Sequence, residues 1–152
     1  MALTLNQIIA LTKSYVAAHK QLNTFQFGDP WEFAESEEVL YPALYMVNGN
    51  VNVDGKTLTH TFNLLICDRI DYNKDNPADS NSQENEVLSD MREVALDILA
   101  MFNNAANRDN FYLVQTSNLD PFVEQFKDWT AGWNLTIQLK QPMLYNRCQV
   151  PV

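Results

Sequence analysis

The residues best suited to chemistry are two histidines and two cysteines, His19, His60, Cys67 and Cys148, which lie far apart in the chain. A structural zinc site draws such ligands from closely spaced pairs, so this spacing predicts no zinc site. His60 is instead expected as a partly buried, fully hydrogen-bonded histidine on the inward face of a strand. The cysteines are those expected of a protein in a reducing compartment, and whether they pair in a disulfide stays open.

A second candidate is the asparagine- and aspartate-rich run that begins at Asp71. Asp71, Asn73 and Asp75 occupy the first three ligand positions of a calcium-binding loop. The sixth position, which needs glycine, is Asn76, and the twelfth, which needs a glutamate, is Ser82. The match is too incomplete to predict a calcium site, so we expect no bound metal.

Motifs for catalysis or cofactor binding are missing from the sequence. It has no G-x-S-x-G elbow, no P-loop and no G-x-G-x-x-G among its four glycines. Carboxylates are abundant, but they lie in charge runs, which usually form solvated surfaces. The sequence therefore predicts a protein that is not an enzyme and that has no cofactor. An enzyme would need His19 or His60 beside an acid in a cleft.

Composition sets the class of protein. The chain has 152 residues, 46% of them apolar, which predicts a single globular domain over 1–152. Its net charge of −9 argues against binding to nucleic acid or to an anionic membrane surface. Neither a signal peptide nor a membrane span is expected. Acidic residues gather in 28–38 and 71–97, as solvated surfaces or as an anionic face in an assembly.

Apolar periodicity predicts two amphipathic helices. The first is expected over about residues 4–20, with Thr4 as N-cap and Gln7 completing a capping box. The second begins at Val87 and ends near Asn103, with an apolar stripe recurring every three or four residues. Residues 71–86 are predicted to form a polar surface loop.

Strands are expected over 24–27, over a long hairpin from 43 to 70, over 111–116 and over 134–140. Asp54-Gly55 suits the tight turn of the hairpin. Residues 117–128 are predicted to form a turn and a short element of secondary structure. The predicted fold is α+β, with an antiparallel sheet and two amphipathic helices packed on one of its faces.

The two late tryptophans are assigned different places. Trp133 alternates in line with Leu135 and is expected in the core beneath the second helix. Trp129 precedes an expected turn at Gly132 and is a candidate interface residue. The other candidate interface residues are Trp31, Asp54, Gly55, Asp75 and Asp79.

The late part of the chain combines Asp128, Ala131-Gly132-Trp133, the strand 134–140 and Cys148. With this segment, the order of elements resembles that of the tail-completion and tail-terminator family of tailed bacteriophages, including ring proteins of crAss-like phage necks and tails. The resemblance spans nearly the whole chain as an order of elements, and at residue level only this late segment.

The resemblance implies a structural virion protein, assembled in the host cytoplasm, that terminates the tail or joins head to tail. It implies a homo-oligomeric ring, often a hexamer or dodecamer, whose partners are other neck and tail proteins. The genome would pass through the lumen without specific nucleic-acid recognition, and no membrane is involved. The alternative is a non-enzymatic binding or adaptor module with an apolar patch beside Trp129 or Trp133 that recognises a peptide or protein.

Overall fold

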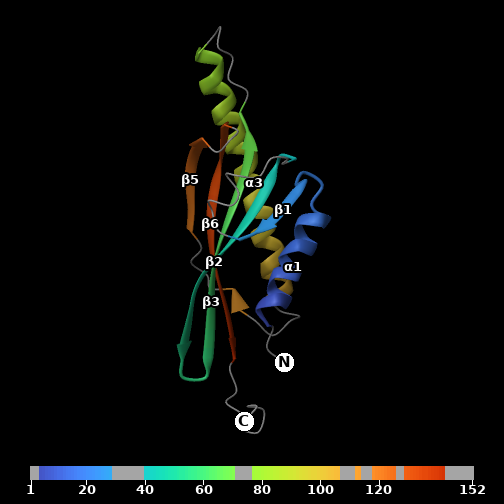
Figure 1. Ribbon diagram of the computed structural model, residues 1–152, viewed down its shortest axis with the longest axis vertical. Coiled ribbons are helices and arrows are strands. Elements are labelled where there is room, and N and C mark those ends of the chain that lie inside the picture. Colours follow the sequence, from blue (N-terminus) through green and yellow to red (C-terminus); the bar gives the residue numbers. More distant parts are fainter. Residues whose placement is uncertain are drawn as a thin grey trace.

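The computed structural model describes residues 4–28, 40–70, 77–106, 112–113, 118–125 and 129–142. For 77–84, 104–106, 112–113, 124–125 and Trp129 the description is of the backbone alone. The elements are α1 (Leu5–Ala18), β1 (Thr24–Phe27), β2 (Ala43–Asp54), β3 (Thr57–Arg69), α3 (Pro77–Ala106), β4 (Tyr112–Leu113), β5 (Asn118–Gln125) and β6 (Trp129–Pro142). The chain is therefore α+β (Figure 1).

The strands form one six-stranded sheet in the order β1-β2-β3-β6-β4, and β5 also pairs with β6. The expected antiparallel arrangement holds for every described pairing except one, because β1 and β2 are parallel. The prediction of an antiparallel sheet was therefore wrong, and the sheet is mixed. Parallel neighbours need a crossover of about a dozen or more residues, and the segment 28–42 between β1 and β2 is long enough.

Helix α1 begins where its capping residues predict. The Thr4 side chain accepts a hydrogen bond from the Gln7 backbone N–H at 3.3 Å, and the Gln7 side chain accepts from the Thr4 N–H at 2.8 Å. This reciprocal pair satisfies two backbone donors that the helix leaves free. Ile8 and Val16 are buried on the face that packs against the core.

Helix α3 is longer than expected. It begins at Pro77, so residues 77–86 are helical and the prediction of a loop there was wrong; residues 71–76 lie outside the described ranges. Proline suits the first position of a helix, since that position needs no backbone donor. Figure 1 shows the first turns of α3 extending past the ends of the strands. These turns cover no sheet, which explains why they carry no apolar stripe.

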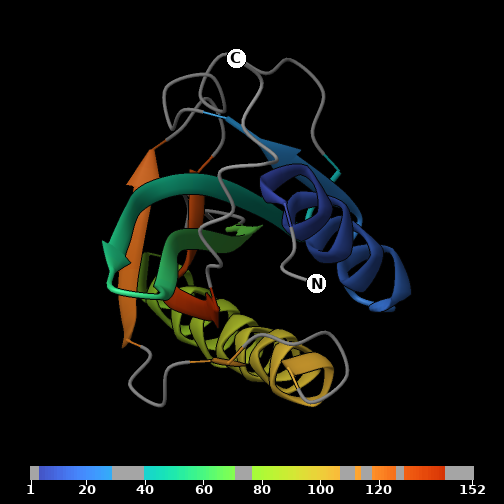
Figure 2. The same ribbon diagram turned by 90° about the horizontal axis from the view of Figure 1, so that it is seen from below.

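Both helices contribute to one core on one face of the sheet. Its buried members are Ile8, Val16, Leu22, Leu44, Met46, Phe62, Leu64, Ile66, Met91, Val94, Ala95, Ile98, Phe102, Leu135, Ile137 and Leu139. The predicted stripes of the second helix and of strands β3 and β6 are thereby confirmed. Figure 2, seen from the hairpin end, shows the sheet as strongly curved, with the two helices beside it.

A smaller apolar cluster lies on the opposite face of the sheet. Ala43, Tyr45 and Cys67 are buried there, with Leu65 and Phe122 packed against them. Cys67 therefore faces away from the main core. Burial, and next the negative charge of Asp68, raise the pKa of the Cys67 thiol to about 12. This thiol therefore stays protonated and unreactive at neutral pH.

Gly132 lies within β6, paired with Cys67 of β3, rather than in the expected turn. A Cβ atom at this position would overlap the carbonyl oxygen of Ile66 and would lie 2.7 Å from the Cα atom of Cys67. The two backbones approach so closely that only glycine fits. The turn prediction was wrong because glycine allows a turn and a close backbone approach equally well.

Candidate functional site

The most prominent surface feature is the hairpin formed by the end of β2 and the start of β3. Its turn holds Asp54 at the end of β2 and Gly55 with a positive φ of 58°, as the Asp-Gly pair predicts. Both residues are exposed. In Figure 1 the hairpin lies at the opposite end of the molecule from the first turns of α3. Its role as an interface stays a prediction.

A β-bulge separates the hairpin from the rest of the sheet. The pairing of β2 with β3 shifts between Asn48, which lies opposite Phe62, and Val51, which lies opposite His60. A bulge adds one residue to a strand and increases the local twist. Figure 1 shows the twist, since the order of β2, β3 and β6 across the picture is reversed between its upper and lower halves.

Beyond the bulge, two valines of β2 are unusually exposed. Val51 and Val53 have 47% and 50% of their surface exposed. Their partners in β3 are His60 and Leu58, so both valines lie on the sheet face that carries the main core. The core face therefore continues along the hairpin as an apolar stripe that reaches solvent.

The same segment of β2 forms an edge of the described sheet. β1 pairs with β2 from Thr24 opposite Ala43 only as far as Phe27 opposite Met46. Within the described ranges, no strand pairs with residues 47–54 on that side. The hairpin thus combines exposed apolar side chains with backbone groups available for strand pairing, a combination typical of association sites.

The other side of the hairpin is held by a buried polar contact. The His60 Nε2 atom lies 3.3 Å from the Gln141 Nε2 atom of β6, and the His60 ring stacks on Phe62 with centroids 6.0 Å apart. Burial lowers the pKa of the His60 imidazole, which favours its neutral form. A neutral Nε2 can accept a hydrogen bond from the Gln141 amide. His60 is buried on the inward face, with 7% of its surface exposed, but the expectation of a fully hydrogen-bonded histidine was wrong, because its Nδ1 atom has no partner in the described part of the chain.

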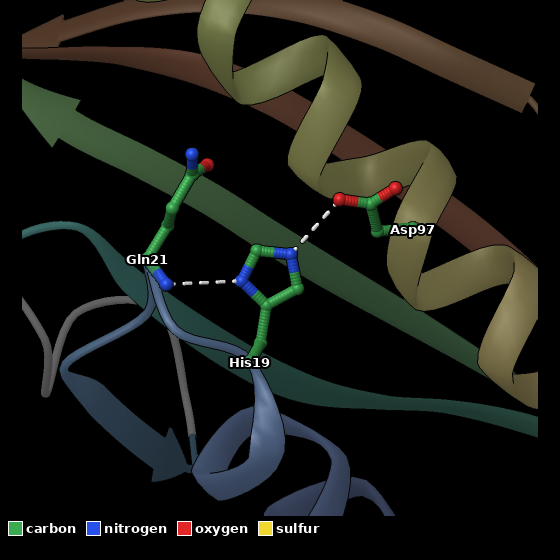
Figure 3. A network of polar contacts seen from close by, with 3 residues as sticks. All are labelled: His19, Gln21 and Asp97. Carbon is green, nitrogen blue, oxygen red and sulfur yellow. Dashed lines mark hydrogen bonds and ion pairs between the residues drawn. The ribbon is translucent and has the colours of Figure 1, made fainter.

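His19, by contrast, lies beside an acid. Its Nε2 atom is 3.0 Å from the Asp97 Oδ2 atom of α3, and its Nδ1 atom accepts a hydrogen bond from the Gln21 backbone N–H at 3.2 Å (Figure 3). With Nδ1 as acceptor, the proton lies on Nε2, which donates to Asp97. Both ring nitrogens are therefore engaged, and the pair ties the C-cap of α1 to α3.

Helix α3 presents a line of exposed carboxylates. Glu86, Asp90, Glu93 and Asp97 recur every three or four residues and so share one side of the helix. Arg92 makes an exposed ion pair with Glu93 at 3.5 Å, and surface pairs of this kind contribute little to stability. This acidic side of α3 is separate from the side that packs on the sheet, where Met91 is buried.

The predicted interface residues fall in different places, and the structure does not bring them into one site. Trp129 lies in β6 with its backbone paired to Gln125, and Asp79 lies in α3, but their side chains lie outside the description. Trp31 and Asp75 lie outside the described residues altogether. Only Asp54 and Gly55 are placed with their surroundings.

Trp133 belongs to the fold, as expected. It packs against the main core, and its indole Nε1–H donates to the Leu88 carbonyl oxygen of α3 at 2.7 Å. Because the polar atom of the ring is used within the protein, Trp133 is a weaker candidate for a ligand platform. The bond joins β6 to α3. The Leu88 carbonyl lies within the helix, where carbonyl oxygens also accept hydrogen bonds from the helix backbone.

Replacing Trp133 with phenylalanine is expected to lower the free energy of unfolding by about 1–2 kcal/mol. The aromatic packing is largely kept, while the hydrogen bond to the Leu88 carbonyl and part of the buried ring are lost. Urea denaturation followed by circular dichroism measures the change. A stability equal to that of the wild type would show that the bond to Leu88 contributes nothing.

The described part of the chain offers neither a metal site nor a membrane-spanning helix. Within it, no group of three or more His, Cys, Asp or Glu side chains is placed to hold a metal ion. None of the helices there is both long enough and apolar enough to cross a membrane.

The chain was also compared with known proteins. No protein-family model matches it, and no curated protein matches it.

Proposed function

We propose that the protein is a structural component of a phage virion that forms a homo-oligomeric ring in the neck or tail, as a tail terminator or a head–tail joining adaptor. The observation that supports assembly with other copies most is the protruding hairpin, which exposes Val51 and Val53 beside an edge without a described partner strand and so offers a surface for contacts within or between rings. Natural proteins usually protect such an edge with charges or proline, and an assembly protects it by burying it.

The charge distribution fits passage of DNA through such a ring. The net charge of −9 includes the exposed line of carboxylates on α3. If that side of α3 faces the lumen, it repels the phosphates of the genome and keeps the passage free of bound DNA. The ring would bind the other neck and tail proteins of the virion through its remaining faces, and it would assemble in the host cytoplasm.

The contacts of the two histidines favour a structural protein over an enzyme. The Nε2 atom of His19 holds α1 to Asp97 of α3 and its Nδ1 atom accepts from the Gln21 backbone N–H, while His60 is buried against Phe62 and Gln141. General acid–base catalysis needs a nitrogen that can reach a substrate proton. Each histidine instead joins two elements of the fold.

Light scattering coupled to size-exclusion chromatography tests the proposal. The purified protein, alone and mixed with the connector and tail proteins encoded beside it, is expected to elute at the mass of a closed multimer. A monomer in every mixture would overturn the proposal. A binding module would instead give a complex with a single copy of this chain.

A further inference from the structure

The backbone of β2 beyond Met46 offers hydrogen-bonding groups at its outer edge. The Met46 carbonyl accepts a hydrogen bond from the Gly28 N–H at 3.2 Å, so the backbone groups of Met46 point toward the side of β1. In a strand, alternate residues point their backbone groups to the same side. The backbone N–H and C=O groups of Asn48 therefore point outward. Because the bulge adds one residue to β2, the backbone groups of Val51 and Val53 point outward as well.

Apart from the bulge between Asn48 and Val51, this edge lacks the charged residues and the proline that commonly prevent strand pairing. Residues 47–53 read Val-Asn-Gly-Asn-Val-Asn-Val and contain no charged residue and no proline. Edge strands are normally blocked by lysine, by proline or by an inward-pointing charge. The segment is also rich in β-branched valine, which favours extended structure.

We propose that the hairpin edge pairs with the same edge of a second copy of this chain, antiparallel and across a twofold axis at Asn52. Val51 of one copy then lies opposite Val53 of the other, and both residues of each pair point their backbone groups at the partner. Each Val51–Val53 pair exchanges two N–H to C=O hydrogen bonds, as in an antiparallel sheet. The sheet becomes continuous through both copies.

A second copy fits this edge better than another partner for two reasons. The alternation of valine and asparagine is self-complementary, since the twofold axis brings valine opposite valine on one face and Asn52 opposite Asn52 on the other. Two copies of a chain with a net charge of −9 repel each other, and residues 51–53 at the axis carry no charge, while Asp54 lies opposite the neutral Asn50 of the other copy rather than opposite a like charge.

The role of this contact in the assembly rests on the proposed function, because it would join copies of the ring protein. A twofold contact closes on itself and cannot by itself propagate around a ring. It therefore joins copies in two rings stacked face to face, while other surfaces make the contacts within each ring.

Cysteine cross-linking tests the register directly. In a Cys148→Ser background, Asn52→Cys is expected to give a disulfide-linked dimer under mild oxidation, because opposed Cβ atoms lie about 5 Å apart. Asn50→Cys is the matched control. Its counterpart in the other copy lies about 13 Å away, four residues along the strand, which is too far for a disulfide. Cys67 is buried in the fold, so it is not expected to form the cross-link.

More cross-linked dimer from Asn52→Cys than from Asn50→Cys supports the pairing. Equal yields, or none from either variant, overturn it. The outcome is separate from that of the proposed function, since rings without the Asn52 cross-link would leave the ring proposal standing and remove only this contact. A cross-linked dimer that forms no ring would support the Asn52 contact and remove the ring proposal.

A substitution pair tests the same contact without oxidation. Val51→Lys adds a charge at each Val51–Val53 pair, and it is expected to raise the dissociation constant of the twofold contact about tenfold. Val123→Lys in β5 is the matched control, since Val123 has a similar exposed fraction of 44%, and it is expected to leave the contact unchanged. Equal effects of both substitutions in sedimentation experiments would contradict the assignment of the edge.

Discussion

Replacing Phe102 with alanine is expected to lower the free energy of unfolding by about 3–5 kcal/mol, which makes it one of the most damaging single changes in the chain. Phe102 of α3 is fully buried, and its ring meets the ring of Tyr15 of α1 edge to face, with centroids 5.1 Å apart. Truncation leaves a cavity where the two helices meet and removes the aromatic pair.

Leu96→Ala is the control for Phe102→Ala, because Leu96 lies on the same helix with 40% of its surface exposed. Its expected cost is below about 1 kcal/mol. Urea denaturation followed by circular dichroism measures both variants. If Phe102→Ala were no more destabilising than Leu96→Ala, the packing of α3 described above would be wrong.

Gly132→Ala is expected to destabilise the protein by about 3 kcal/mol or more, although it adds only one methyl group. The new Cβ atom would overlap the Ile66 carbonyl oxygen, which belongs to backbone and cannot turn aside as a side chain could. β6 cannot shift as a whole either, because Gly132 is paired with Cys67 on one side and with Phe122 on the other.

Gly55→Ala separates this overlap from the general effect of replacing a glycine. A Cβ atom at Gly55 meets nothing within 4 Å, so the cost comes only from the positive φ of 58° and is expected to be about 1 kcal/mol. Thermal and urea denaturation of the two variants give the comparison. Equal losses would show that β3 and β6 are not as close at Gly132 as described.

The elements with a strong local signal could be predicted from the sequence. The capping box at Thr4 and Gln7 and the Asp54-Gly55 turn each depend on residues close together in the chain, and both are confirmed. The stripe from Met91 to Phe102 was equally clear, because that side of α3 covers the sheet.

Features that depend on distant parts of the chain could not be predicted. The parallel pairing of β1 with β2 depends on the path of the connecting segment 28–42. The periodicity of apolar residues within a strand carries no information about that path. The strand β5 contains Pro121, which suggested a turn. Proline is tolerated there because one side of β5 has no partner strand in the part of the chain that the structure describes.

The candidate interface could be predicted only in part. The hairpin and its turn followed from the sequence, but the exposed valines did not. Val47 packs with the smaller cluster on one face, whereas Val51 and Val53 lie on the other face. Simple alternation places all three on one face, and Gly49, which lies within the bulge, does not by itself distinguish a bulge from a close backbone approach in a regular strand.

Negative-stain electron microscopy of the purified protein tests the central claim, assembly into a ring, most directly. The account predicts closed rings with a central opening in the class averages, either from the protein alone or after mixing with neighbouring neck and tail proteins. Uniformly small particles without an opening under both conditions would contradict it.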